Sequence, residues 1–289
     1  MLLDTGASQT WVMGSTCTSE PCTNHNSFGA VNSTTFETAE GNWSVKYGSG
    51  SCSGGFGNDT LNFAGLSLPI TLGIADIVSN DFNNFPMDGI LGLSQASGQY
   101  PSFIKTLVDS KTLKSNLFAI SLNRESDGPN TGEISFGSPD VAKYTGSISY
   151  TPVSANADGD WAIPMDGLSF SGNDAGITGK LAYIDTGTSY IFGPPAQVAQ
   201  FHALVPGAKS SDDYTWTVPC TTTTPLTFTF SGVTYNVSSK DWVSPMANGV
   251  CTSNVYGNDI ISGQWLLGDT FLKNVYVVFD IDGSRIGKF

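Results

Sequence analysis

Two short stretches of the sequence carry the same acidic pattern. Residues 3–8 read Leu-Asp-Thr-Gly-Ala-Ser, and residues 184–189 read Ile-Asp-Thr-Gly-Thr-Ser. The chain's composition predicts Asp-Thr-Gly-x-Ser roughly 0.03 times, so two copies indicate an internal repeat. Two carboxylates within hydrogen-bonding reach share a proton, so one can accept a proton from water while the other donates to a carbonyl oxygen. If the loops meet, the expected chemistry is general acid–base hydrolysis without a covalent intermediate.

The elements that hold these loops are repeated as well. Each Asp-Thr-Gly follows an apolar strand-like residue, and roughly 85 residues later each copy has an apolar-apolar-Gly element, at 90–92 and at 266–268. We therefore expect two lobes with the same internal plan. The predicted boundary lies near residues 145–155, which gives an N-terminal lobe at 1–148 and a C-terminal lobe at 149–289.

Short alternating runs bounded by Gly, Asn, Asp or Pro predict mostly strands, for example at 42–47, 226–230 and 275–279. Helical periodicity is sparse, with candidates at 101–113 and 195–204 that both begin with Pro. The fold class predicted from these patterns is mostly β, with a few short helices.

Composition excludes several classes of protein. The 289 residues include 12 Lys and Arg against 25 Asp and Glu, for a formal net charge of −13. With no basic cluster, we expect no nucleic acid and no anionic membrane among the partners. No apolar run approaches the roughly 18 residues of a membrane span, and the first residues do not resemble a signal peptide. Self-repulsion among unpaired carboxylates weakens in acid, which favours an acidic working environment.

Cysteine and histidine usage favours disulfides over metal binding. Five Cys and two His form no zinc-type ligand set, and five Cys allow 15 ways of making two disulfides. Neither His25 nor His202 has a nucleophile context, so both are interpreted as structural. Asn-x-Ser/Thr sequons, which favour a secreted glycoprotein, occur at Asn32, Asn42, Asn58 and Asn236.

Further motifs accompany the two triplets. They are Trp11, Val45-Lys-Tyr47-Gly48-Ser49-Gly50-Ser51, Asp88-Gly-Ile-Leu-Gly-Leu93, Tyr144-Thr-Gly146 and Trp265-Leu-Leu-Gly-Asp-Thr-Phe271. On these residues the sequence resembles the pepsin-like aspartic proteases, including fungal secreted members, along essentially the whole chain. The resemblance implies a bilobal acid protease fold of two similar β lobes. It also implies an aspartic endopeptidase that needs neither a metal nor an organic cofactor.

The resemblance assigns a role to each residue of the two loops. Asp4 and Asp185 would be the catalytic pair, and Thr5 and Thr186 would brace the loops against each other. Residues 45–51 would form a hairpin flap over the substrate, with Trp11 hydrogen-bonding the hydroxyl of Tyr47. The residues expected to contact substrate are Leu2, Gly6, Tyr47, Gly48, Ser49, Phe103, Gly187 and Thr188, with Leu113 as a further wall.

The same resemblance implies the disulfides, the partners and the specificity. It pairs Cys17 with Cys22 and Cys220 with Cys251, which leaves Cys52 unpaired. Because nothing cationic adjoins Cys52 to stabilise a thiolate, a small core residue is favoured over the alternative, a reactive thiol. Ser49 stands where some fungal relatives carry an Asp that accepts Lys, so we expect hydrophobic residues at the scissile bond. Expected partners are peptide and protein substrates and statine-type inhibitors such as pepstatin. The protein would be a monomer, secreted or in an acidic vacuolar compartment.

Two departures from the family pattern leave alternatives open. Only three residues precede Asp4, whereas relatives carry additional strands there, so a catalytically impaired peptide-binding relative is the alternative function. A carboxylate-pair glycosidase is disfavoured, because its acids rarely repeat within identical triplets. Ala7 replaces a Ser that many relatives have, which predicts an acidic limb of the activity profile at higher pH than Ser would give.

Overall fold

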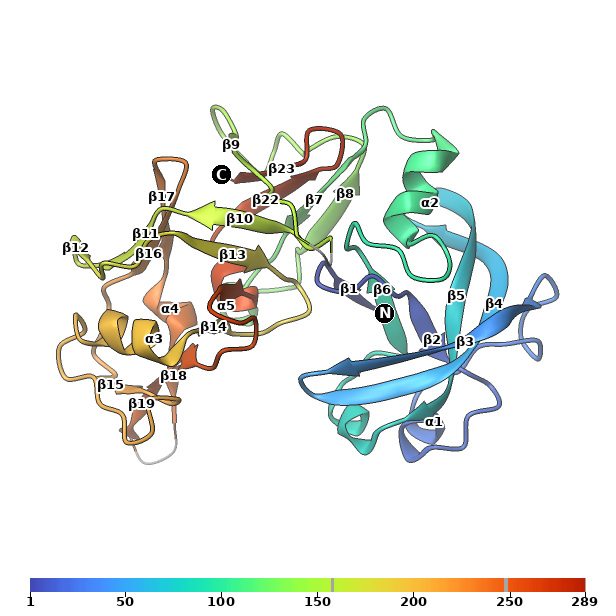
Figure 1. Cartoon of the computed structure of the whole chain (residues 1–289), viewed down its shortest axis with the longest axis horizontal. Helices are drawn as coiled ribbons and strands as arrows, with labels where there is room; N and C mark the ends of the chain where they lie inside the picture. The colour runs from blue at the N-terminus through green and yellow to red at the C-terminus, as the bar shows by residue number, and fades with distance from the viewer. Residues whose placement is uncertain (157–158, 247–248, 289) are drawn as a thin grey trace. The chain divides into compact units, whose positions relative to one another are not determined.

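The computed structural model describes residues 1–156, 159–246 and 249–288, and it divides into two compact units, Met1–Leu113 and Lys114–Phe289. In unit 1, one sheet has the strand order β1-β6-β2-β5-β4-β3 (Figure 1). Its strands are β1 (Leu2–Asp4), β2 (Trp11–Met13), β3 (Glu37–Tyr47), β4 (Gly50–Phe63), β5 (Leu66–Val78) and β6 (Gly89–Gly92). The helices are α1 (Glu20–Asn24), the 3-10 turn η1 (Asn80–Asn84) and α2 (Phe103–Ser110).

The described residues of unit 2 form four sheets, with orders β10-β13-β21-β14-β20, β12-β11-β16-β17, β15-β19-β18 and β8-β7-β22-β23-β9. Its strands are β7 (Leu117–Ser121), β8 (Glu133–Phe136), β9 (Ser149–Pro152), β10 (Ala162–Met165), β11 (Gly167–Phe170), β12 (Asn173–Asp174), β13 (Lys180–Ile184), β14 (Ile191–Gly193), β15 (Thr217–Val218), β16 (Leu226–Phe230), β17 (Val233–Val237), β18 (Val243–Pro245), β19 (Cys251–Ser253), β20 (Val255–Gly257), β21 (Trp265–Leu267), β22 (Tyr276–Asp280) and β23 (Arg285–Lys288). The helices are η2 (Glu125–Asp127), α3 (Pro195–His202), α4 (Ser239–Trp242) and α5 (Asp269–Leu272).

The same four-strand plan occurs in both units. In unit 1, β1 runs parallel to β6, β2 runs antiparallel to β6, and β2 runs parallel to β5. In unit 2, β13 and β21, β14 and β21, and β14 and β20 pair in the same three senses. The repeat seen in the sequence is therefore a repeat of topology, and the mostly β, two-lobed fold class is confirmed.

The helices are shorter than their periodicity predicted. α2 begins at Phe103 because Ser102 caps it, its hydroxyl accepting from the backbone N–H of Lys105, and it ends where Lys111 adopts a left-handed φ of 54°. α3 ends at His202 rather than at residue 204. Helix ends depend on single backbone conformations, which an apolar pattern does not specify.

The predicted lobe boundary falls within unit 2. The sheet β8-β7-β22-β23-β9 joins strands that precede residue 148 to strands at the end of the chain, through pairings such as Phe118 with Phe279. The rings of these two residues also stack, with centroids 4.6 Å apart. This sheet explains why the compact units divide at residue 113, and the boundary at 148 stays a prediction.

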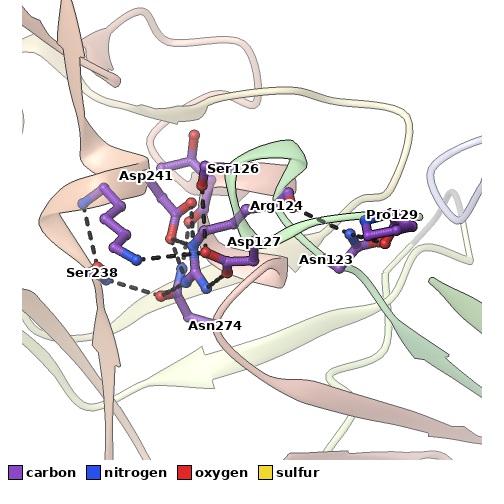
Figure 2. Close-up of polar contacts among 10 residues, drawn as sticks. Asn123, Arg124, Ser126, Asp127, Pro129, Ser238, Asp241 and Asn274 are labelled. Carbon is purple, nitrogen blue, oxygen red and sulfur yellow. Dashed lines mark hydrogen bonds and ion pairs between the residues drawn. The ribbon is translucent and has the colours of Figure 1, made fainter. Parts of the chain in front are cut away.

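A polar network fixes the β7–β8 connection within unit 2. Figure 2 shows Arg124 among Asp127, Asp241 and Asn274. Its Nη2 donates to Asp241 and Asn274, each at 2.7 Å, and Nη1 donates to Asp127 at 3.1 Å. Asp241 is buried, so the guanidinium supplies the charge-assisted bonds that offset its desolvation.

A lysine is fully buried near the end of unit 2. Lys288, 1% exposed, places Nζ over the ring of Phe230, 4.6 Å from its centroid, and donates to Thr151 Oγ1 at 3.3 Å. Burial lowers the pKa of this ammonium to about 7, and the negative charge of Asp166 opposes the shift.

Candidate active site

Asp4 closes the first of the two repeated strands. It ends β1 opposite Gly92 of β6, and only 6% of its surface is exposed. Its backbone oxygen accepts from Leu93 N at 2.8 Å, and its Oδ1 accepts from the backbone N–H of Gly6 at 2.9 Å. The tight turn of Asp-Thr-Gly thus orients the carboxylate with a backbone donor two residues ahead.

Asp185 occupies the corresponding place after β13. Its backbone N–H donates to Leu267 O at 3.1 Å, and its Oδ1 accepts from Gly187 N at 2.8 Å, as in the first copy. The hydroxyl of Thr188 adds a donor to Oδ2 at 2.6 Å. Ala7, at the equivalent position of unit 1, has no hydroxyl, so the two carboxylates differ at one donor.

Each loop is held against a glycine of the second repeated element. Ala7 O accepts from Ser94 N at 3.0 Å, and a Cβ on Gly92 would lie 2.6 Å from that same carbonyl oxygen. In unit 2 a Cβ on Gly268 would lie 2.0 Å from Thr188 O. Both positions require Gly because the loop backbone packs directly on them.

The threonines of the two triplets are buried. Thr5 is fully buried and Thr186 is 8% exposed. Their bracing role stays a prediction. The predicted pocket residues lie in different environments: Leu2 packs half-buried against the unit 1 core, whereas Phe103 is buried with its ring against Phe63.

Residues 45–51 form the tip of a long hairpin. Strands β3 and β4 form this hairpin (Figure 1). Tyr47 of β3 pairs with Gly50 of β4, which leaves Gly48 and Ser49 exposed in a two-residue turn. A φ of 124° at Gly50 is accessible to glycine and rare for other residues. The hairpin predicted from the flap motif is therefore present, and its role over the substrate stays a prediction.

The base of this hairpin tip is fixed by aromatic side chains. Trp11 is fully buried and donates its indole N–H to the hydroxyl of Tyr47 at 2.9 Å. Phe82 packs edge-on against both, with centroids 5.5 Å from Trp11 and 6.2 Å from Tyr47. Burial raises the pKa of the Tyr47 hydroxyl well above its usual range, so it stays protonated in acid.

The cysteines follow the expected pattern. Disulfides join Cys17 to Cys22 and Cys220 to Cys251. Cys52 is a free, buried thiol between Val45 and Val78 of the neighbouring strands. Burial raises its pKa to about 12, which keeps it a thiol and fits a core residue.

Sequence reasoning missed one carboxylate beside the second loop. Asp269 begins α5, and its backbone N–H donates to Thr188 O at 2.8 Å. Burial raises the pKa of its carboxyl to about 6; the Lys273 ammonium opposes the shift, and the negative charge of Asp185 adds to it. It lines a cavity of about 370 Å³ with Lys273 and Glu125. The sequence offered one indication of a role for Asp269, namely its position inside the motif at 265–271.

An aromatic cluster next to the second loop was also missed. Tyr190, five positions after Asp185, lies 5.1 Å from Tyr256 between ring centroids, and Phe192 and Tyr214 contact the same Tyr256 ring at 5.7 and 5.8 Å. Tyr190 and Tyr214 are each 42% exposed. Tyr190 and Phe192 lie two residues apart, but Tyr214 and Tyr256 come from distant segments, so no local pattern in the sequence joins all four rings.

Two kinds of site are not found in the part of the chain that the structure describes. No three His, Cys, Asp or Glu side chains gather there in a way that could hold a metal ion. Among the same residues, no helix is long and apolar enough to cross a membrane. The expectation of a metal-free mechanism stays a prediction.

Comparisons with known proteins agree with this geometry. Residues 1–288 match the family model of eukaryotic aspartyl proteases, so the chain belongs to that family. It is 42% identical over 296 residues to the aspartic-type endopeptidase ctsD of Aspergillus fumigatus, covering 99% of this chain and 61% of that protein. It is 42% identical over 292 residues to a probable aspartic-type endopeptidase CTSD of Arthroderma otae, with 99% and 77% covered.

A vertebrate relative shows how far the similarity extends. Pepsin A of Sus scrofa is 33% identical over 300 residues, covering 99% of this chain and 76% of that protein. The chain spans less than two thirds of the Aspergillus relative, at 61% of its length.

Proposed function

We propose that the protein is an acid endopeptidase in which Asp4 and Asp185 together activate a water molecule. The observation that carries the proposal is a repeated arrangement. A strand paired in parallel ends in Asp4 in one unit and is followed by Asp185 in the other, and Oδ1 of each Asp accepts the N–H of the Gly two residues on, at 2.9 Å and 2.8 Å. A backbone donor favours the ionised carboxylate, and two such groups brought together share one proton.

The proposed reaction needs only these two side chains and water. The ionised carboxylate takes a proton from water, whose oxygen attacks the peptide carbonyl carbon, while the protonated partner donates to the carbonyl oxygen. The resulting tetrahedral diol collapses when the carboxyl that took the proton from water passes it to the leaving nitrogen, the other carboxylate takes back a proton from a diol hydroxyl, and the C–N bond breaks. The flap would exclude bulk water, with the Tyr47 hydroxyl held by Trp11.

Substrate is proposed to bind as an extended strand beneath the hairpin tip. Gly48 and Ser49 are exposed there, and their backbone N–H groups would pair with the peptide, as in strand addition. Ser49 provides no carboxylate for Lys, so hydrophobic residues are expected beside the scissile bond. A peptide library in which Lys is preferred at that position would contradict this specificity.

The test compares cleavage of denatured casein or haemoglobin at acidic pH by the unaltered chain and by Asp185→Asn. We expect cleavage by the first, blocked by a statine-type inhibitor, and a loss of at least about 10³-fold in the variant. Asp174→Asn is the matched control, because Asp174 also accepts from the glycine two residues on, Gly176 N at 2.9 Å, and is exposed. Equal activity of Asp185→Asn and Asp174→Asn would overturn the proposal.

Measuring inhibitor binding alongside cleavage distinguishes the alternative function from the proposed one. A catalytically impaired peptide-binding relative would bind the statine inhibitor, seen as a rise in melting temperature, yet release no peptides. A correctly folded chain that binds but does not cleave would therefore favour the binding function.

We also propose secretion, or residence in an acidic vacuolar compartment, as a monomer that handles peptides rather than nucleic acid or membranes. Among the sequons, Asn42, Asn58 and Asn236 lie exposed on strands, where a glycan can point into solvent. Asn32 is also exposed, but its amide closes a turn, accepting from Gly29 N and donating to Ser27 O. Glycopeptide mass spectrometry of the secreted chain tests their occupancy.

A further inference from the structure

A buried histidine of unit 2 is stacked on a tryptophan. His202 ends α3 with 1% of its surface exposed. Its ring lies flat on Trp216, with centroids 4.6 Å apart and planes 3° from parallel. Phe201 covers its edge, with centroids 4.7 Å apart. The contact joins the end of α3 to the start of β15, across the connecting segment 203–216.

The hydrogen bonding of the ring fixes the tautomer of its neutral form. Nδ1 lies 2.9 Å from Val198 O, which only accepts, so Nδ1 carries the hydrogen and Nε2 of the neutral ring carries a lone pair. Among the described residues, the buried side-chain nitrogen and oxygen atoms without a partner are His202 Nε2, Trp216 Nε1 and Thr252 Oγ1. The parallel rings cannot satisfy each other, because a ring N–H donates within its own plane.

The three unpaired atoms belong to residues of one region of unit 2, where the end of α3 meets strands β15 and β19. Thr252 of β19 pairs with Thr217, the residue after Trp216, and Ser253 N donates to Trp216 O at 2.8 Å. A buried polar atom without a partner costs free energy, and the cost rises when the group becomes charged. Protonation would place an imidazolium with an unpaired N–H in this corner.

No charged side chain among the described residues of the surrounding elements offsets the positive charge of a protonated His202. α3, β15 and β19 carry no other charged side chain, and the segment 203–216 contributes Lys209, Asp212 and Asp213. Asp212 accepts from backbone N–H groups of its own turn, including that of Tyr214. The charged residues of neighbouring α4, Lys240 and Asp241, bind Asp127 and Arg124. Burial lowers the pKa of His202 to about 4, opposed only by the Val198 carbonyl.

We propose that the His202–Trp216 stack is an acid-sensitive latch that holds the segment 203–216 on unit 2 and opens when His202 is protonated. The segment is also attached by the mutual backbone bonds of Lys209 and Thr217, at 2.8 and 2.9 Å, and by Gly257 N donating to Tyr214 O at 2.9 Å. Ser253 N donating to Trp216 O and the contact of the Tyr214 ring with Tyr256 add to these attachments. Opening exposes the imidazolium to water and relieves its desolvation. The device would loosen this part of unit 2 at the acid end of the working range, independently of the proposed catalysis.

The chain contains two His, which makes the first test direct. NMR titration of the full chain, in an Asp185→Asn background that prevents self-digestion, should give one midpoint near pH 4 and one above 6.5. His25, whose pKa is raised by its bonds to the Phe85 and Pro21 carbonyls, supplies the upper one. His202→Phe assigns the lower curve. A midpoint of His202 at or above 6.5 would refute the latch.

Hydrogen exchange measures the opening itself. Between pH 7 and pH 3 the opening constant reported by the Thr217 and Gly257 amides should rise by about 200-fold, after correction for intrinsic exchange, because the open state binds the proton more tightly. His202→Phe, which keeps a stacking ring, and His202→Asn, which keeps a donor for Val198 O, should both abolish the rise. The Gly73 amide of unit 1, bound to Thr10 O, is the internal control. The same rise in both variants, or none in the parent chain, would overturn the proposal.

Discussion

The hydroxyl of Thr188 donates to Oδ2 of Asp185 at 2.6 Å, whereas the residue three positions after Asp4 is Ala7. The backbone bond to the carboxylate is the same in both units, so this side chain is a point of asymmetry between two otherwise repeated loops. A donor to an ionised carboxylate stabilises its charged form, so the asymmetry bears on the pH dependence of activity.

Ala7→Ser should move the acidic limb of the pH–rate profile to lower pH by about 0.5–1 unit, because the added hydroxyl favours ionisation of the proposed pair. Thr188→Ala should move the limb in the opposite direction. Ser8→Ala, which removes a neighbouring hydroxyl, serves as the control and should leave the limb in place. An unmoved limb in Ala7→Ser would contradict the argument.

Trp11→Phe should lower kcat/KM by about 10-fold, because the Tyr47 hydroxyl loses its indole donor and the hairpin tip its fixed position. Tyr47→Phe should have a similar effect, and the double variant should lose little more, since both remove one interaction. Tyr100→Phe, whose hydroxyl donates to Glu40 O at 2.8 Å, is a matched control in the same unit. If the losses of kcat/KM in the two single variants add up fully in the double variant, Trp11 and Tyr47 do not act through their shared hydrogen bond.

Asp269→Asn should flatten the pH dependence of unit 2 stability. The folded-state pKa of about 6 lies above the ordinary 3.8, so the folded state binds more protons between these values and is stabilised as pH falls. At pH 7 the parent chain bears the cost of the buried charge, up to about 3 kcal/mol, and the variant does not. Urea unfolding at pH 4 and pH 7 measures the difference. A variant whose free energy of unfolding changes with pH as the parent's does would refute this assignment.

Lys288→Met should raise the free energy of unfolding at and below pH 7, by up to about 5 kcal/mol. The folded-state pKa of about 7 lies below the ordinary 10.5, so the unfolded state binds more protons between these values. The parent chain therefore gains stability as pH rises from 7 to 10.5, and the variant should not. Lys114→Met, at an exposed position, is the comparison, and equal behaviour of the two variants would count against the buried charge.

The repeat made much of this fold predictable. Asp-Thr-Gly and apolar-apolar-Gly recur in order, and the structure pairs them as parallel neighbours, Asp4 opposite Gly92 and Ile184 opposite Leu267. The hairpin at 45–51 was predictable for a different reason, because the residues that resemble a flap motif are consecutive in the sequence. What the sequence could not show was pairing between distant segments that share no repeated motif, such as Phe118 with Phe279, on which the division into units depends.

The missed site features have the same origin. The burial of Asp269 and the contact of His202 with Trp216 arise from packing between elements that no periodicity connects. His202 was predicted to be structural from the absence of a nucleophile, but its stacking and its unpaired nitrogen appear only in three dimensions. A sequence motif can identify the residues that carry the chemistry, whereas the burial and the neighbouring charges that shift their pKa values depend on the fold.

The buried thiol of Cys52 makes the opening of the hairpin measurable without any substitution in the chain. It is the free cysteine of the chain, it lies between β3 and β5 within the sheet, and folded it is inert because its pKa is about 12. An alkylating reagent can therefore react only while these strands are separated. The rate at which Cys52 is labelled, followed by mass spectrometry, therefore measures how often the hairpin separates from the sheet. The rates with and without a bound inhibitor can then be compared.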